Sequence, residues 1–227
     1  MQVEKPARYI GNEVNAVMKN AEEVEVRFAM CFPDVYEIGM SHLGIQILYD
    51  MLNSFEDVWC ERVYSPWVDL DRIMREKHIP LFALESQDPI TEFDFLGITI
   101  QYEMCYTNVL QLLDLSGIPL KAEERGMDFP IVIGGGACAY NPEPLAPFFD
   151  LFYIGEGEIS YNALFDAYIE NKKAGGSKAD FLKKAAQVPG IYVPSFYDVT
   201  YKEDGTIASF IPNTPEAPEK VEKQLIV

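Results

Sequence analysis

Short apolar runs alternate with helix-periodic segments from about residue 24 onward, and this alternation is the feature that most constrains the fold. The runs are too short for helices and apolar on successive positions, which is typical of strands buried on both faces. Between them, apolar residues recur at helical spacing, as in Leu43, Ile47, Leu48 and Met51. The pattern predicts strands at residues 24–32, 58–65, 93–101, 130–136 and 151–155.

Strands that alternate with helices form parallel βαβ units with right-handed crossovers. We therefore expect an α/β fold of the flavodoxin-like or Rossmann-like kind. Its five-stranded parallel sheet would have the order 2-1-3-4-5 and helices on both faces. Ser41 is the expected N-cap of the first helix. Residues 81–85 are interpreted as an added edge strand.

The character of the chain changes after residue 173. Ser177 and Asp180 have the spacing of a capping box and predict a short helix. Residues 203–205 separate two strand-like runs and predict a hairpin, and a proline-rich linker follows. The expected organisation is an N-terminal extension (1–23), an α/β domain (24–173), and a helix, hairpin and linker (174–227).

Composition excludes several classes of function. The net charge of −18 opposes direct binding to nucleic acid or to anionic lipid. No signal peptide and no apolar run of membrane-spanning length is present, so a cytoplasmic protein is expected. The four cysteines are widely separated, which predicts neither a metal site nor a disulfide framework. We identify no catalytic constellation, and a monomer is the default expectation.

Ligands of doubly wound sheets bind beyond the carboxyl ends of the strands, where the strand order reverses. This rule places three segments around one crevice: residues 32–41, 101–106 and 134–141.

In the first segment, Asp34, Tyr36 and Gly39 have the spacing D-x-Y-x-x-G. One interpretation makes Asp34 a turn cap and Tyr36 a core or rim aromatic residue. His42, at the expected helix start, would be a neutral hydrogen-bonding group there.

The other candidate binding residues follow later strands. Gly134, Gly135 and Gly136 would let a flat or extended ligand approach the backbone, or would serve only a tight loop. They do not open a helix, which argues against a dinucleotide fingerprint. Glu156, expected at a helix N-terminus, would stabilise that helix or contact a ligand or neighbouring domain.

Three stretches together carry a resemblance to a known family: FPDVYEIGMSHLGIQILY, FDFLGITIQYEMCYTNVLQLL and IVIGGGACAYNPEPLAPFFDLFYIGEGE. They resemble the N-terminal, B12-binding-like domain of a family of radical S-adenosylmethionine (radical SAM) Fe–S oxidoreductases. The resemblance covers nearly the whole chain. It implies a downstream barrel whose C-x-x-x-C-x-x-C motif holds a [4Fe–4S] cluster and binds S-adenosylmethionine. That motif does not occur in these 227 residues, so the radical chemistry would belong to the downstream domain.

The resemblance also implies roles for the candidate residues. Cobalamin-binding domains carry D-x-H-x-x-G in the first loop, where the His ligates cobalt and the Asp orients it. Tyr36 stands at the His position, and a phenol is a poor cobalt ligand. Cobalamin would therefore bind without a protein nitrogen, with Asp34 and Gly39 beneath it, unless His42 replaced the missing ligand. Gly134, Gly135 and Gly136 would pass its nucleotide tail.

Two further functions stay open. The domain would otherwise be a cofactor-free recognition or docking module that contacts its own downstream radical SAM domain. A less favoured alternative is an independent nucleotide-binding protein.

Overall fold

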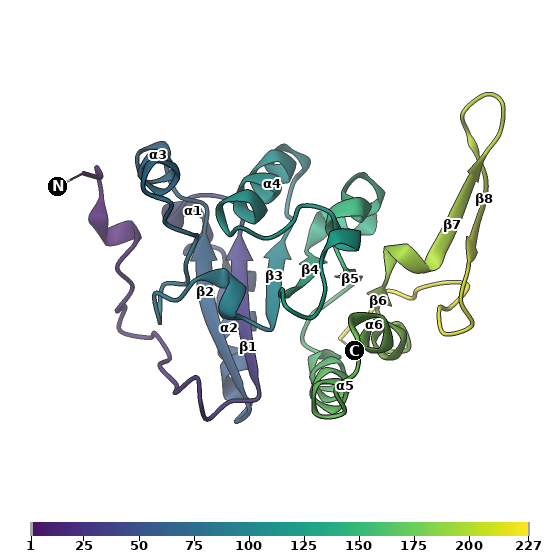
Figure 1. Ribbon diagram of the computed structural model, residues 1–227, viewed down its shortest axis with the longest axis horizontal. Coiled ribbons are helices and arrows are strands. Elements are labelled where there is room, and N and C mark those ends of the chain that lie inside the picture. Colours follow the sequence, from purple (N-terminus) through teal and green to yellow (C-terminus); the bar gives the residue numbers. More distant parts are fainter. Residues whose placement is uncertain (1, 227) are drawn as a thin grey trace.

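The computed structural model describes residues 2–226. Met1, which begins the expected N-terminal extension, and Val227, which ends the expected C-terminal segment, lie outside the described residues. The chain forms a mixed α/β unit whose sheet has the order β2-β1-β3-β4-β5-β6, flanked by helices (Figure 1). The sheet strands are β1 (Val26–Phe32), β2 (Val58–Tyr64), β3 (Phe95–Thr99), β4 (Ile131–Gly135), β5 (Leu151–Tyr153) and β6 (Ile191–Tyr192). The helices are α1 (Tyr36–Gly39), α2 (Leu43–Ser54), α3 (Val68–Lys77), α4 (Tyr106–Leu115), α5 (Tyr161–Lys173) and α6 (Lys178–Ala185).

Neighbours among the first five strands of this order pair in parallel, whereas β6 pairs antiparallel with β5. The predicted five-stranded sheet was therefore one strand short. The sixth strand comes from the stretch expected to form only the hairpin. Pro194 cannot donate a backbone hydrogen bond, and a 3₁₀ turn (Pro194–Phe196) separates β6 from β7 (Tyr197–Tyr201). β7 then pairs with β8 (Ile207–Pro212) in a hairpin that projects from the body (Figure 1).

The sheet is covered on both faces, as its apolar strands require. One core lies under α2, α5 and α6 and includes Phe28, Phe95 and Phe165. The other lies under α3 and α4 and includes Leu96 and Leu112. Every residue of β1 is buried, which explains why its sequence is apolar on successive positions from Phe28 onward.

Two local predictions were wrong. Ser41 does not cap α2, because its hydroxyl donates to the Ile38 carbonyl and closes the short helix α1. The cap is His42, whose Nδ1 accepts from the backbone N–H of Ile45 at 3.4 Å.

The predicted capping box of Ser177 and Asp180 is confirmed at the start of α6.

Residues 81–85 do not form an edge strand. Within them Phe82 makes only an isolated bridge to Pro89. The segment instead contacts the outer edge of β2 through single hydrogen bonds. Leu84 N–H donates to the carbonyl of Arg62 at 2.9 Å, and the Glu85 carboxylate accepts from the N–H of Arg62 at 2.7 Å. A side chain therefore occupies the position that a second strand's backbone would take.

Side chains also satisfy backbone groups of the β2 edge at Cys60 and Val58. The Asn53 side chain donates to the Cys60 carbonyl and accepts from the Cys60 N–H, at 2.9 and 3.0 Å. The ammonium of Lys19, in the N-terminal extension, donates to the Val58 carbonyl at 2.6 Å. The extension runs along this side of the sheet (Figure 1).

Candidate functional site

The carboxyl edge of the sheet, where the parallel strands end, brings the predicted segments together. β3 lies between β1 and β4, and Ile98 pairs with Cys31 on one side and with Gly134 on the other. The loops that follow β1 and β4 therefore leave the same edge, separated by the exit of β3. The strand order reverses between β1 and β3, where ligands of such sheets bind.

Asp34 is joined to Tyr102 across this reversal point. The Tyr102 hydroxyl donates to Asp34 Oδ2 at 2.6 Å, and Asp34 Oδ1 accepts from the Val35 N–H. The hydrogen bond to Asp34, with burial, raises the pKa of Tyr102 to about 12. Tyr102 was missed as a site residue by sequence reasoning, although it falls in the segment expected to line the crevice.

Tyr36 is bound to the N-terminal extension. Its hydroxyl donates to Glu13 Oε1 at 2.8 Å, and Arg62 donates to the other oxygen of Glu13 at 2.7 Å. Burial and the Glu13 carboxylate raise the pKa of Tyr36, so the phenol stays protonated. Its ring packs edge-on against Tyr64, with the ring centroids 5.5 Å apart.

Gly39 and His42 have packing and capping roles. A Cβ at Gly39 would lie 2.3 Å from the Tyr64 ring, so only glycine lets α1 approach β2 this closely. The His42 ring lies 5.2 Å from the Phe32 ring, centroid to centroid, while its Nδ1 caps α2.

The three glycines after β4 differ in their surroundings. Gly134 packs against the Phe152 ring, which a Cβ would approach to 2.5 Å. Gly136 has a φ of 91° and lies against the backbone of Ile100. Around Gly135 a Cβ would meet no atom of residues 2–226 within 4 Å. Gly135 is therefore the glycine at which the backbone is open to approach.

Glu156 contacts the last described segment of the chain, not a helix. α5 begins five residues later, at Tyr161, so the predicted position at a helix N-terminus was wrong. The Glu156 N–H donates to the Gln224 carbonyl at 3.0 Å, and its carboxylate accepts from the Ile226 N–H at 2.5 Å. Gln224 N–H donates in turn to the Ile154 carbonyl. Residues 224–226 are thereby held against the exit of β5.

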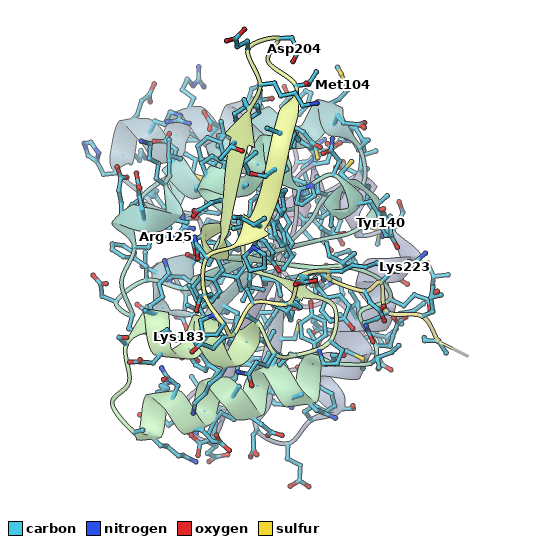
Figure 2. The ribbon with its side chains drawn as sticks, turned by 90° about the vertical axis from the view of Figure 1, so that its right-hand side faces the viewer. Met104, Arg125, Tyr140, Lys183, Asp204 and Lys223 are labelled. Atoms are coloured by element: carbon cyan, nitrogen blue, oxygen red, sulfur yellow. The ribbon has the colours of Figure 1, made fainter. Side chains whose placement is uncertain are left out.

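Exposed apolar side chains gather at the carboxyl edge. They come from the loops after four different strands, from the start of α2 and from the segment held by Glu156. Met104 is the most exposed of them, at 84%. Figure 2 shows Met104, Tyr140 and Lys223 on one side of the molecule, with Arg125 on the other. We call this set the apolar rim: Ile38, Met40, Leu43, Tyr102, Met104, Tyr140, Ile159, Leu225 and Ile226.

Residues 2–226 offer neither a cluster of metal ligands nor a membrane-spanning helix. Within residues 2–226 no group of three or more His, Cys, Asp or Glu side chains is arranged to hold a metal ion. No helix of that same stretch has the length and apolar character to cross a bilayer.

Comparison with known proteins gives two matches. The family model described as "Radical SAM proteins, N-terminal" matches residues 44–194. The uncharacterized protein MJ0966 of Methanocaldococcus jannaschii is 28% identical over 133 residues. That alignment covers 58% of this chain but only 24% of MJ0966, so the chain matches about a quarter of this relative's length.

Proposed function

From the premise that this chain belongs to the family of radical SAM protein N-terminal domains, we propose that it is the accessory domain of a radical SAM enzyme. Its carboxyl edge faces the domain that carries the cluster and S-adenosylmethionine. The function is recognition and docking at that domain, without a cofactor of its own.

The apolar rim is the observation that carries this proposal. Large apolar side chains exposed together mark interaction surfaces. The rim lies where the strand order reverses, which is where ligands and partners of such sheets approach. Glu156 holds residues 224–226 at this edge, so this segment also belongs to the surface that we propose for docking.

The β1 loop does not fit a cobalt-ligating site. Tyr36 donates its only hydroxyl proton to Glu13. Asp34, the residue that would orient a histidine, accepts from Tyr102 instead. His42 uses its Nδ1 to cap α2. Each group is committed to a partner within the chain, which favours the cofactor-free function.

Cobalamin bound without a protein ligand is the second candidate, and the open backbone at Gly135 favours it. Incubation with hydroxocobalamin followed by gel filtration separates the two candidates. A colourless protein peak is expected if the domain has the docking function without a cofactor. Corrin absorbance retained by the protein peak would refute the cofactor-free function in favour of cobalamin binding.

The docking surface is tested with Met104→Glu in the protein that carries the following domain. Hydrogen exchange of residues 101–106 should be slower in that protein than in this chain alone, and Met104→Glu should remove the difference. Ile207→Glu is the matched control, because Ile207 is also exposed, at 56%, but lies on β8 of the projecting hairpin. Equal exchange in both forms of the unsubstituted protein would refute docking at this edge. A reading frame without C-x-x-x-C-x-x-C downstream would refute the accessory role itself.

A further inference from the structure

A groove of about 900 Å³ lies at the opposite, amino-terminal edge of the sheet. It is bounded by residues 121–127, by the residues before β5, by the first turn of α6 and by the turn at Pro194–Phe196. This size is in the range of pockets that bind small molecules. No residue of the apolar rim lines it, so it is independent of the proposed docking function.

The walls of the groove are apolar. Met127, Phe149, Leu182, Pro194 and Phe196 line it from four different segments of the chain. Displacing water from such walls is favourable for an apolar ligand body.

The floor of the groove carries a buried charge cluster with a surplus of positive charge. Arg125 and Asp150 are 4% and 3% exposed, and Arg125 Nη2 lies 3.1 Å from Asp150 Oδ2. The Lys178 ammonium contacts the other Asp150 oxygen. Two cations thus share one carboxylate, in a protein whose net charge is −18.

One donor of this cluster lacks a partner. The buried Nε–H of Arg125 has no acceptor among residues 2–226, whereas its Nη groups and the Lys178 ammonium also donate to backbone carbonyls. Lys178 and Ala179 form the first turn of α6 and line the groove, and the N-terminal end of a helix carries partial positive charge. A surplus cation in a low-dielectric site is stabilised by an anion brought close to it.

We propose that this groove binds an elongated apolar molecule that ends in a carboxylate. The apolar body lies along Met127, Phe149 and Phe196, and the carboxylate lies beside Lys178 and the first turn of α6, near the buried Arg125–Asp150 pair. Size, apolar walls and a positive floor together select this class over neutral or cationic amphiphiles.

Isothermal titration of this chain with decanoate, 1-decanol and decylamine, each below its micelle concentration, tests the proposal. Decanoate should bind about tenfold more tightly than decanol, as expected for a charge-assisted contact, and decylamine should bind most weakly. Equal affinity for decanoate and decanol, or no binding of decanoate, overturns the proposal.

Two variants locate the site. Ala179→Trp places a large side chain at an exposed helix position that lines the groove, and should weaken decanoate binding at least about tenfold. Ala208→Trp, on the exposed strand β8, is the control and should bind as the unsubstituted chain does. Lys178→Met should abolish the preference for decanoate over decanol. Undiminished binding by a folded Ala179→Trp protein refutes the assignment of the groove, even if Lys178→Met fails to fold.

Discussion

Replacing Tyr102 with phenylalanine removes the one hydroxyl that links the β1 loop to the β3 exit across the reversal point. The bond to Asp34 is 2.6 Å long and its acceptor is a carboxylate, so it belongs to the strong, charge-assisted kind. Buried bonds of this kind contribute about 1.5–3 kcal/mol. Tyr102 is 38% exposed, and solvent screening reduces the expected loss to about 1 kcal/mol.

Urea unfolding measures this loss as a lower midpoint with an unchanged slope. For a protein of this size a loss of about 1 kcal/mol lowers the Tm by about 2–4 °C. A double-mutant cycle with Asp34→Ala isolates the pair, because alanine leaves no acceptor for the Tyr102 hydroxyl and the two losses should therefore not add. Additive losses would show that Tyr102 and Asp34 do not interact, and would refute the reasoning.

The pH dependence of the same variant supplies an independent check. The pKa of Tyr102 is raised in the folded protein, from 10.0 to about 12. Its stabilisation is fully present below pH 10 and is lost as the pH rises through 12, because the unfolded chain releases the proton first. The difference in unfolding free energy between the unsubstituted protein and Tyr102→Phe should therefore narrow above pH 10. If this difference in unfolding free energy stays constant as the pH rises above 10, the hydrogen bond assigned to Tyr102 and Asp34 is contradicted.

Three further predictions follow from other contacts. Gly155→Ala should release residues 224–226, because Gly155 has a φ of 123° and a Cβ there would lie 2.3 Å from the Gln224 carbonyl oxygen. Hydrogen exchange of residues 224–226 should therefore accelerate. It should not accelerate in the control variant Gly135→Ala, because a Cβ at Gly135 would meet no atom within 4 Å among residues 2–226. Arg125→Met should cost about 3 kcal/mol in urea unfolding, since it breaks a buried ion pair, and a loss under about 1 kcal/mol would contradict the burial of that pair. Glu13→Gln should cost about 1 kcal/mol at pH 7. Although burial opposes it, the bonds to Glu13 lower its pKa below 4.5. The cost of Glu13→Gln should therefore shrink as the pH falls below 4.5, and a cost that stays constant with falling pH would contradict this.

The strands of the sheet were predictable because burial on both faces makes them apolar on successive positions. Residues of β1, β3 and β4 show this directly, since Phe28, Leu96 and Val132 are all fully buried. The two residues of β6 carry no such signal. A strand of two residues has no periodicity, and β6 runs in the reverse direction because two helices, α5 and α6, connect it to β5.

The contacts of the candidate site were not predictable in the same way. Asp34 was selected from its local spacing, but its partner Tyr102 is 68 residues away in the chain. Glu13 lies in an extension to which the pattern assigned no role, yet it holds Tyr36. Glu156 was expected to open a helix because a helix-periodic segment begins at Ile159. Pairings between distant side chains depend on the sheet order and on loop geometry, which local spacing does not encode.

The outer edge of β2, where side chains of Asn53, Glu85 and Lys19 take up the free backbone groups, has a consequence for assembly. An open strand edge invites another polypeptide to add itself as the next strand, which leads to aggregation and exchange of segments between molecules. At the β2 edge of this sheet, side chains already occupy backbone groups to which an added strand would bind. At the opposite edge, β6 has only two residues with which an added strand could pair. Strand addition at either edge of this sheet is therefore disfavoured, which leaves the ends of the strands as the open approach.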